Sequence, residues 1–233
     1  MVSLAVISVL IALMFPAITM VRESTRRVIC GSNLRQLGMG VSIYAQDHKD
    51  RLPGSVFLPP QHSNAASFPA YDRMDTVWLS REEFPGMRND LWDGLGYLYG
   101  EEYIAAANLY YCPSHHGGFT FEEASDDWAQ LDPREEIIIN YLYRGTGPQG
   151  ARVLYKIPSS AALVTDTLRS YNDLNHEGGF NVLQAGLAVN WFEDIGGEIA
   201  QGILMRTDDD NPNHSSTVQN AWGRLDQMPG GQD

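Results

Sequence analysis

Positive charge is scarce in this 233-residue chain. It carries 29 acidic and 16 basic side chains, for a formal net charge of −13 at pH 7, and its only lysines are Lys49 and Lys156. Four arginines lie between positions 22 and 35, which leaves the rest of the chain more acidic still. Such a surface repels the phosphate backbone of nucleic acids. No nucleic-acid partner is therefore expected.

Catalytic motifs are missing as well. The chain has no Gly-x-Ser-x-Gly elbow, no His-Glu-x-x-His motif and no phosphate-binding loop. Gly145-Thr146-Gly147-Pro148 is typical of a turn, because no Gly-Lys-Ser/Thr follows it to hold phosphate. A Ser/His/Asp set could be drawn from Ser170, His176 and Asp166, but any chain of this size offers such a set. The sequence predicts a protein that is not an enzyme.

Cysteine is too scarce for a disulfide framework, since only Cys30 and Cys112 occur. In an exported protein the two could form one disulfide, worth roughly 4 kcal/mol or somewhat more in the chain-entropy model. The alternative is a pair of unbonded, buried thiols. Sequence alone does not show whether the two sulfur atoms meet.

Two short segments carry residue types that bind metals. Cys112, His115 and His116 resemble half of a zinc site, but no second Cys/His pair follows at finger-like spacing. A loop with solvent-exposed histidines is predicted instead.

A late acidic segment offers oxygen ligands for calcium, the one cofactor that the sequence suggests: Asp208, Asp209 and Asp210. It does not fit an EF-hand, because the sixth position is Asn213 and the twelfth is Gln219. A solvated acidic turn without a cofactor is predicted instead.

The first 21 residues contain no charged side chain. As a helix they would be about 31 Å long, enough to cross a bilayer. A cleaved secretory signal is disfavoured, because there is no basic n-region and no small-residue cleavage site before Arg22. Residues 1–21 are predicted to span a membrane and then to pack against identical helices in a filament core, through these residues: Val2, Leu4, Val6, Ile7, Leu10, Ile11, Leu13, Phe15 and Pro16.

The helix is predicted to continue beyond the apolar run as an amphipathic segment, 22–52. Leu34, Leu37, Val41 and Tyr44 share one helical face, and the first clear stop is Leu52-Pro53-Gly54. One helix of about 50 residues is expected, bent or loosened at Pro16. Its glycines would allow close approach of another backbone: Gly31, Gly38 and Gly40. The alternative is a plain membrane anchor with a short stalk.

Residues 53–225 are predicted to form a globular α+β domain with an antiparallel sheet packed on the amphipathic helix. The segment Asp90–Ala107 is expected to hold one or two short helices. The polar tail 226–233 is expected to be frayed. Strands are predicted near Ile137–Tyr143, Arg152–Tyr155, Ala161–Asp166, Asn181–Gln184 and Leu187–Trp191.

The region from Met1 to about Pro53 resembles the N-terminus of type IV pilins and type II secretion pseudopilins. It is most similar to prepilin-type proteins of Planctomycetes and Verrucomicrobia, the H-x9-DG group. The match rests on VSLAVISVLIALMFPAI, then on R-E-S-T-R-R-x-x-C and C-x-x-N-L-R-Q-L-G, with an aromatic-Cys-Pro segment and N-H-E-G-G-F further on. The matching motif residues include Asn33, Leu34, Gln36, Gly38, His176 and Gly179.

This sequence departs from the family pattern in two places. Gly186-Leu187 stands where the family has Asp-Gly at a hairpin turn, so no role of that Asp carries over. The basic leader, its Gly cleavage site and the Phe-Thr-Leu-Ile-Glu that follows are not found before Met1. Either the start was assigned too late, which we favour, or this copy is not processed. Without a leader, the arginines after the apolar run would place the domain in the cytoplasm by the positive-inside rule, whereas the resemblance implies an exported domain.

The resemblance implies a pilin or pseudopilin, anchored by one span in the inner membrane with a periplasmic or extracellular domain. Its implied partners are copies of itself in a cell-surface or secretion filament and the machinery that assembles it. The alternative is a membrane-tethered binding module that does not polymerise. Its ligand surface could include a group of tyrosines, although ordinary packing is their expected role: Tyr97, Tyr99, Tyr103, Tyr110 and Tyr111.

Overall fold

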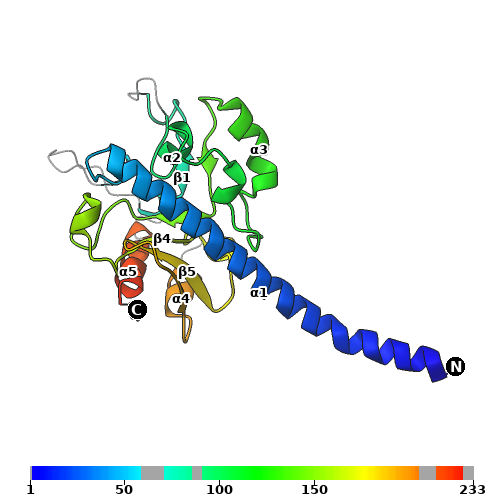
Figure 1. Ribbon diagram of the computed structural model, residues 1–233. Coiled ribbons are helices and arrows are strands. Elements are labelled where there is room, and N and C mark those ends of the chain that lie inside the picture. Colours follow the sequence, from blue (N-terminus) through cyan, green and yellow to red (C-terminus); the bar gives the residue numbers. More distant parts are fainter. Residues whose placement is uncertain (1, 59–70, 86–90, 205–213, 228–233) are drawn as a thin grey trace.

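The longest element is the single helix α1 (Val2–Asp47), which runs past the globular domain and projects from it (Figure 1). The computed structural model describes residues 2–58, 71–85, 91–204 and 214–227. Helix α1 continues through Pro16 and ends five residues earlier than predicted. The helix ends early because Lys49 and Asp50 both adopt a left-handed conformation, with φ of 59°, which cannot continue a right-handed helix. That left-handed turn directs Arg51 into a bridge with Val153.

The predicted apolar stripe on the second half of α1 is buried. Leu34 and Leu37 are fully inaccessible, and Val41 and Tyr44 are nearly so. Full burial of one such aliphatic side chain stabilises the fold by roughly 1.5–3 kcal/mol. The stripe therefore docks the helix onto the domain.

Two helix glycines lie in close contact with side chains of the same chain. A Cβ on Gly38 would lie 2.7 Å from Leu183 Cδ1, and one on Gly40 would lie 2.6 Å from Ile104 Cδ1. Both glycines thus let α1 approach its own domain closely.

The fold is α+β, as predicted. The short helices are α2 (Gly96–Gly100), α3 (Phe121–Gln130), α4 (Glu198–Leu204) and α5 (His214–Leu225). The strands are β1 (Thr76–Trp78), β2 (Ile137–Ile138), β3 (Tyr141–Tyr143), β4 (Ala162–Asp166), β5 (Gly179–Gln184) and β6 (Val189–Glu193). Single 3-10 turns occur at η1 (Tyr71–Arg73), η2 (Ala107–Tyr110), η3 (Leu154–Lys156) and η4 (Tyr171–Asp173).

Strands β3, β4, β5 and β6 form an antiparallel sheet in that order, and β1 pairs with β2 in a separate two-stranded sheet. Helix α1 packs on β5 and β6. Strand β4 is buried along its whole length, including the polar residues Thr165 and Asp166 at its end. The sheet therefore places the ends of β4 and β5 beneath the middle of α1 (Figure 1).

Some predicted elements were wrong in detail. Residues 137–143 form two strands, because Ile139 pairs with Asp75 and Asn140 with Tyr110 through their backbone N–H groups. Residues 152–155 form no strand: Val153 makes an isolated bridge and Leu154 starts η3. Helix α3 was missed, although the sequence shows its capping box, in which Thr120 and Glu123 bond reciprocally.

The predicted tail, 226–233, begins with a residue that is held in place. The carboxylate of Asp226 accepts hydrogen bonds from Arg144 at 2.7 and 2.8 Å and from the Ala162 N–H at 3.0 Å. Residues 228–233 lie outside the described part of the chain.

Among the described residues, no helix combines the length and the apolar character needed to cross a membrane. The predicted spanning segment, 1–21, consists mainly of residues whose side chains are not described, namely 1–13 and 15–17.

Candidate functional site

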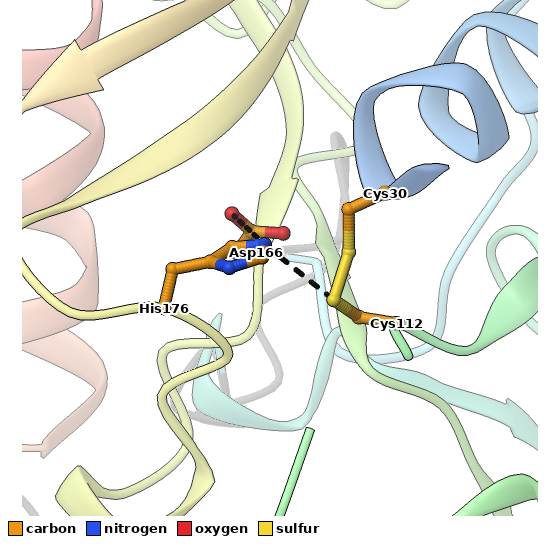
Figure 2. Close-up of side chains that lie close together, drawn as sticks. All are labelled: Cys30, Cys112, Asp166 and His176. Carbon is orange, nitrogen blue, oxygen red and sulfur yellow. Dashed lines mark hydrogen bonds and ion pairs between the residues drawn. A yellow bond between two sulfur atoms is a disulfide. The ribbon is translucent and has the colours of Figure 1, made fainter. Parts of the chain in front are cut away.

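Four chemically active side chains meet beneath α1 (Figure 2). Cys30 comes from α1, Cys112 follows η2, Asp166 ends β4, and His176 lies in the loop before β5. One ligand-type atom from each lies within 4.8 Å of the other three, and all four residues are buried. The cluster thus joins the long helix to two strands of the sheet.

Cys30 and Cys112 form a disulfide, the first of the two alternatives left open by the sequence. Their Cα atoms are 5.2 Å apart and 82 positions apart in the chain. The Tyr141 hydroxyl donates to Cys30 Sγ at 3.3 Å. The disulfide ties α1 covalently to the domain.

Asp166 is a fully buried carboxylate that receives three hydrogen bonds. Its Oδ2 accepts the Asn181 backbone N–H at 2.6 Å and the Asn181 side-chain amide at 3.3 Å, while Oδ1 accepts the Asn175 amide at 3.2 Å. Desolvation raises the pKa of Asp166, and His176 together with these hydrogen bonds opposes that rise. The amides hold the carboxylate in a single orientation.

His176 connects the carboxylate, the disulfide and the long helix. Its Nδ1 lies 2.6 Å from Glu23 Oε1 on α1, and its Nε2 lies 3.5 Å from Cys112 Sγ and 4.0 Å from Asp166 Oδ2. The described bonds of His176 therefore go to α1 and to the buried cluster.

The hairpin between β5 and β6 does turn at Gly186-Leu187, the position that the resemblance indicated. The Leu187 N–H donates to Gln184 O at 2.9 Å, and Leu187 has φ of 67°. Leucine is strained there, where glycine would not be.

The charged residues after the apolar run dock α1 onto the domain. Besides contacting His176, Glu23 accepts a hydrogen bond from the Ser114 hydroxyl at 2.9 Å. The Arg27 guanidinium lies 3.2 Å from the centre of the Trp191 ring. Desolvation lowers the pKa of Arg27, and the nearby acids Asp166, Glu193 and Glu23 oppose this. These residues fix the rotation of α1 about its own axis.

Cys112, His115 and His116, which resemble half of a zinc site in the sequence, do not come together as ligands. His115 Nδ1 lies 2.8 Å from Asn175 Oδ1 and its Nε2 lies 2.6 Å from Gly118 O, whereas His116 Nδ1 faces Ser114 O. His176, 64 positions away, is the histidine that approaches Cys112. Of the two neighbouring histidines only His116 is exposed, so the predicted loop of exposed histidines is half right.

Two cavities border the cluster. One of about 520 Å³ is lined by His176, Glu177 and Asp194 among others. The other, of about 460 Å³, is lined by Cys112 and Asn140, and Asn140 Oδ1 is buried without a hydrogen-bond partner among the described residues. The cluster is therefore buried but bordered by open space on two sides.

The remaining predicted site residues fall elsewhere. Asp208, Asp209 and Asp210, the calcium candidates, lie outside the described residues. Among the family-motif residues, Asn33 is buried and donates to Tyr111 O at 3.1 Å, and Gln36 is half-buried. Gly179 is required by packing, because a Cβ there would lie 2.1 Å from Phe192 O.

The tyrosines proposed as a ligand surface serve mainly in packing. Tyr110 and Tyr111 are buried, and Tyr99 packs edge-on against Trp128. Tyr103 donates its hydroxyl to Asp47 at 2.8 Å. The expected packing role therefore accounts for this group.

Comparison of the chain with models of protein families, with curated proteins and with solved structures gives no match.

Proposed function

We propose that this chain is a structural subunit of a filament of the type IV pilus or type II secretion class, and that it assembles through α1. The observation that carries the proposal is the division of one unbroken helix into two parts. Its second half is docked on the sheet, and its first half projects away from the domain (Figure 1). A filament whose core consists of helices needs this arrangement in every subunit.

The projecting part presents an apolar stripe. Met14, Ile18 and Val21, spaced by four and three, are 58%, 44% and 64% exposed. With Arg22 they line a shallow groove of about 230 Å³. Covering exposed apolar area of this kind with another apolar surface lowers the free energy of the system. An identical helix offers a matching stripe.

The attachment of α1 to the domain also fits this role. The disulfide, the Glu23–His176 contact and the Arg27–Trp191 contact all lie where the helix leaves the domain. They keep each domain in one orientation on its helix. Subunits stacked through their helices would then present their domains in one repeating arrangement.

Within the same proposal, residues 1–21 lie in the inner membrane before assembly, the domain is outside, and an assembly machinery extracts the subunit. No catalytic activity and no cofactor are assigned. The proposal rests on the resemblance of the first 53 residues together with the geometry of α1.

Assembly tests the proposal directly. The full chain is purified in detergent, the detergent is removed, and particles are examined by negative-stain electron microscopy and sedimentation. We expect filaments or long oligomers for the wild type and their loss in Ile18→Asp, which places a charge in the stripe.

Ile195→Asp is the matched control, because Ile195 is 81% exposed in the loop before α4, far from α1 in sequence. It should assemble like the wild type. A chain that stays monomeric, or assembly that Ile18→Asp leaves intact, would contradict the proposal. A monomeric chain would favour a tethered module that does not polymerise, for which the cavity of about 520 Å³ beside His176 would be the candidate binding site.

A further inference from the structure

We infer that Cys30, Cys112, Asp166 and His176 bind one Zn²⁺ ion when the disulfide between the two cysteines is reduced. The inference rests on the buried cluster alone and is independent of the filament role. It assigns two states to the site: a disulfide under oxidising conditions and a metal centre under reducing conditions.

The four ligand atoms are already close to the required geometry. Zinc in proteins is tetrahedral, with bonds of 2.0–2.3 Å, so its ligand atoms lie about 3.3–3.8 Å from one another. Here the four atoms lie within 4.8 Å of one another. Cleavage of the S–S bond would separate the sulfur atoms, and a shift of about 1 Å elsewhere would complete the tetrahedron. Two thiolates, one imidazole and one carboxylate are all ligands that zinc accepts.

The residues around the cluster supply a second, independent argument. Metal-bound histidines commonly donate their other ring N–H to a carboxylate, which fixes the tautomer. Glu23 Oε1 lies 2.6 Å from His176 Nδ1, so an N–H there would leave the Nε2 lone pair directed at the cluster. On the opposite side, the amides of Asn175 and Asn181 hold Asp166, and Tyr141 contacts Cys30. Contacts from outside the cluster therefore orient three of the four ligands: His176, Asp166 and Cys30.

Charge favours a cation at this place. Asp166 is fully buried, and burying a carboxylate without a full counter-charge is costly. Two thiolates and Asp166 around Zn²⁺ leave a net charge of −1, with the Arg27 guanidinium nearby to offset it. In the oxidised state the sulfur atoms are bonded to each other and only two ligands remain, which is too few for a structural zinc site.

The reaction balances with a dithiol as the reductant. The dithiol is oxidised to its own disulfide, and its two electrons and two protons pass to the cysteine sulfur atoms as the S–S bond breaks. Zinc then displaces both protons and binds the two thiolates. Cys112 lines the cavity of about 460 Å³, which gives a small reductant a route, and His176 lines the cavity of about 520 Å³, which gives the metal a route.

Zinc stoichiometry tests the inference. The full chain in detergent is reduced anaerobically with dithiothreitol, and the dithiothreitol is then removed. The reduced protein is dialysed against a small excess of zinc, and bound metal is measured by elemental analysis. We expect one zinc per reduced chain and none per oxidised chain. Cobalt in place of zinc should give the strong visible absorption of a tetrahedral centre and a thiolate charge-transfer band.

Variants identify the ligands. His176→Gln and Asp166→Asn keep both cysteines, and each should weaken zinc binding at least tenfold. The matched control, His116→Gln, changes a nearby histidine outside the cluster and should bind like the wild type. Reduced wild-type chain that binds no zinc overturns the inference, and so does binding that survives His176→Gln. If reduction unfolds the chain, zinc must restore its helical circular dichroism, and failure to do so counts equally against the site.

Discussion

The disulfide between Cys30 and Cys112 offers the most quantitative prediction. It closes a loop across 82 positions. In the chain-entropy model, a loop of this size restricts the unfolded chain by about 4.5 kcal/mol at 25 °C. Because the bond joins α1 to the domain, its loss also permits the helix to detach. We therefore expect Cys112→Ala to lower the free energy of unfolding by about 4–5 kcal/mol.

The assay is urea unfolding of the full chain, followed by tryptophan fluorescence, with EDTA present so that no metal contributes. Cys30→Ala should cost the same as Cys112→Ala, and the double variant should cost little more, because either single change already removes the bond. A chemically reduced wild type should match them. A loss below about 1 kcal/mol would refute the magnitude derived from chain entropy. Fully additive losses would refute the argument that the two cysteines act through one bond.

Two further predictions concern single residues. Leu187→Gly should raise the free energy of unfolding by about 0.5–1 kcal/mol, because Leu187 has φ of 67° and glycine accepts that conformation without strain; a decrease in the urea midpoint would contradict this. Burial raises the pKa of Asp93 to about 7, against hydrogen bonds from Val56 and Ser55 that lower it. A carboxyl whose pKa is raised on folding binds its proton more tightly in the folded state, so the stability it contributes is complete below about pH 4 and is lost as the pH rises through about 7. Asp93→Asn should remove this loss, so that the difference in unfolding free energy between variant and wild type shifts in favour of the variant from pH 4 to pH 8; a constant difference would contradict the assigned cause.

Local patterns were sufficient for the long helix. The spacing of Leu34, Leu37 and Val41 predicts one buried helical face, because the period of a helix brings these positions together without any information on the rest of the chain. The helix end was predicted too late, since the proline that stops a helix marks only its latest possible end. The left-handed turn at Lys49 and Asp50 came earlier.

Strand prediction succeeded where the whole strand is buried. It failed where strand formation depends on hydrogen-bond pairing with a distant part of the chain. The first three residues of β4 are apolar, and the strand lies between β3 and β5, so its composition is informative. Residues 152–155 contain apolar side chains as well, but they pair only with the short segment that follows α1, through the isolated bridge between Arg51 and Val153. A single bridge is not a strand. The capping box of α3 shows that some missed elements did carry a local signal.

The sequence by itself determined the class of fold, the long helix and the absence of known catalytic motifs, because each depends on composition or on neighbours within a few turns of chain. Only the tertiary structure decided that Cys30 meets Cys112 and that His176, not His115 or His116, completes their surroundings. Cys30 and Cys112 are 82 positions apart in the chain, and Cys112 and His176 are 64 positions apart. No local sequence pattern encodes contacts over such separations. These residues meet because the buried face of α1 packs on β5 and β6, which brings Cys30 beside Asp166 at the end of β4. That packing is set by the whole domain.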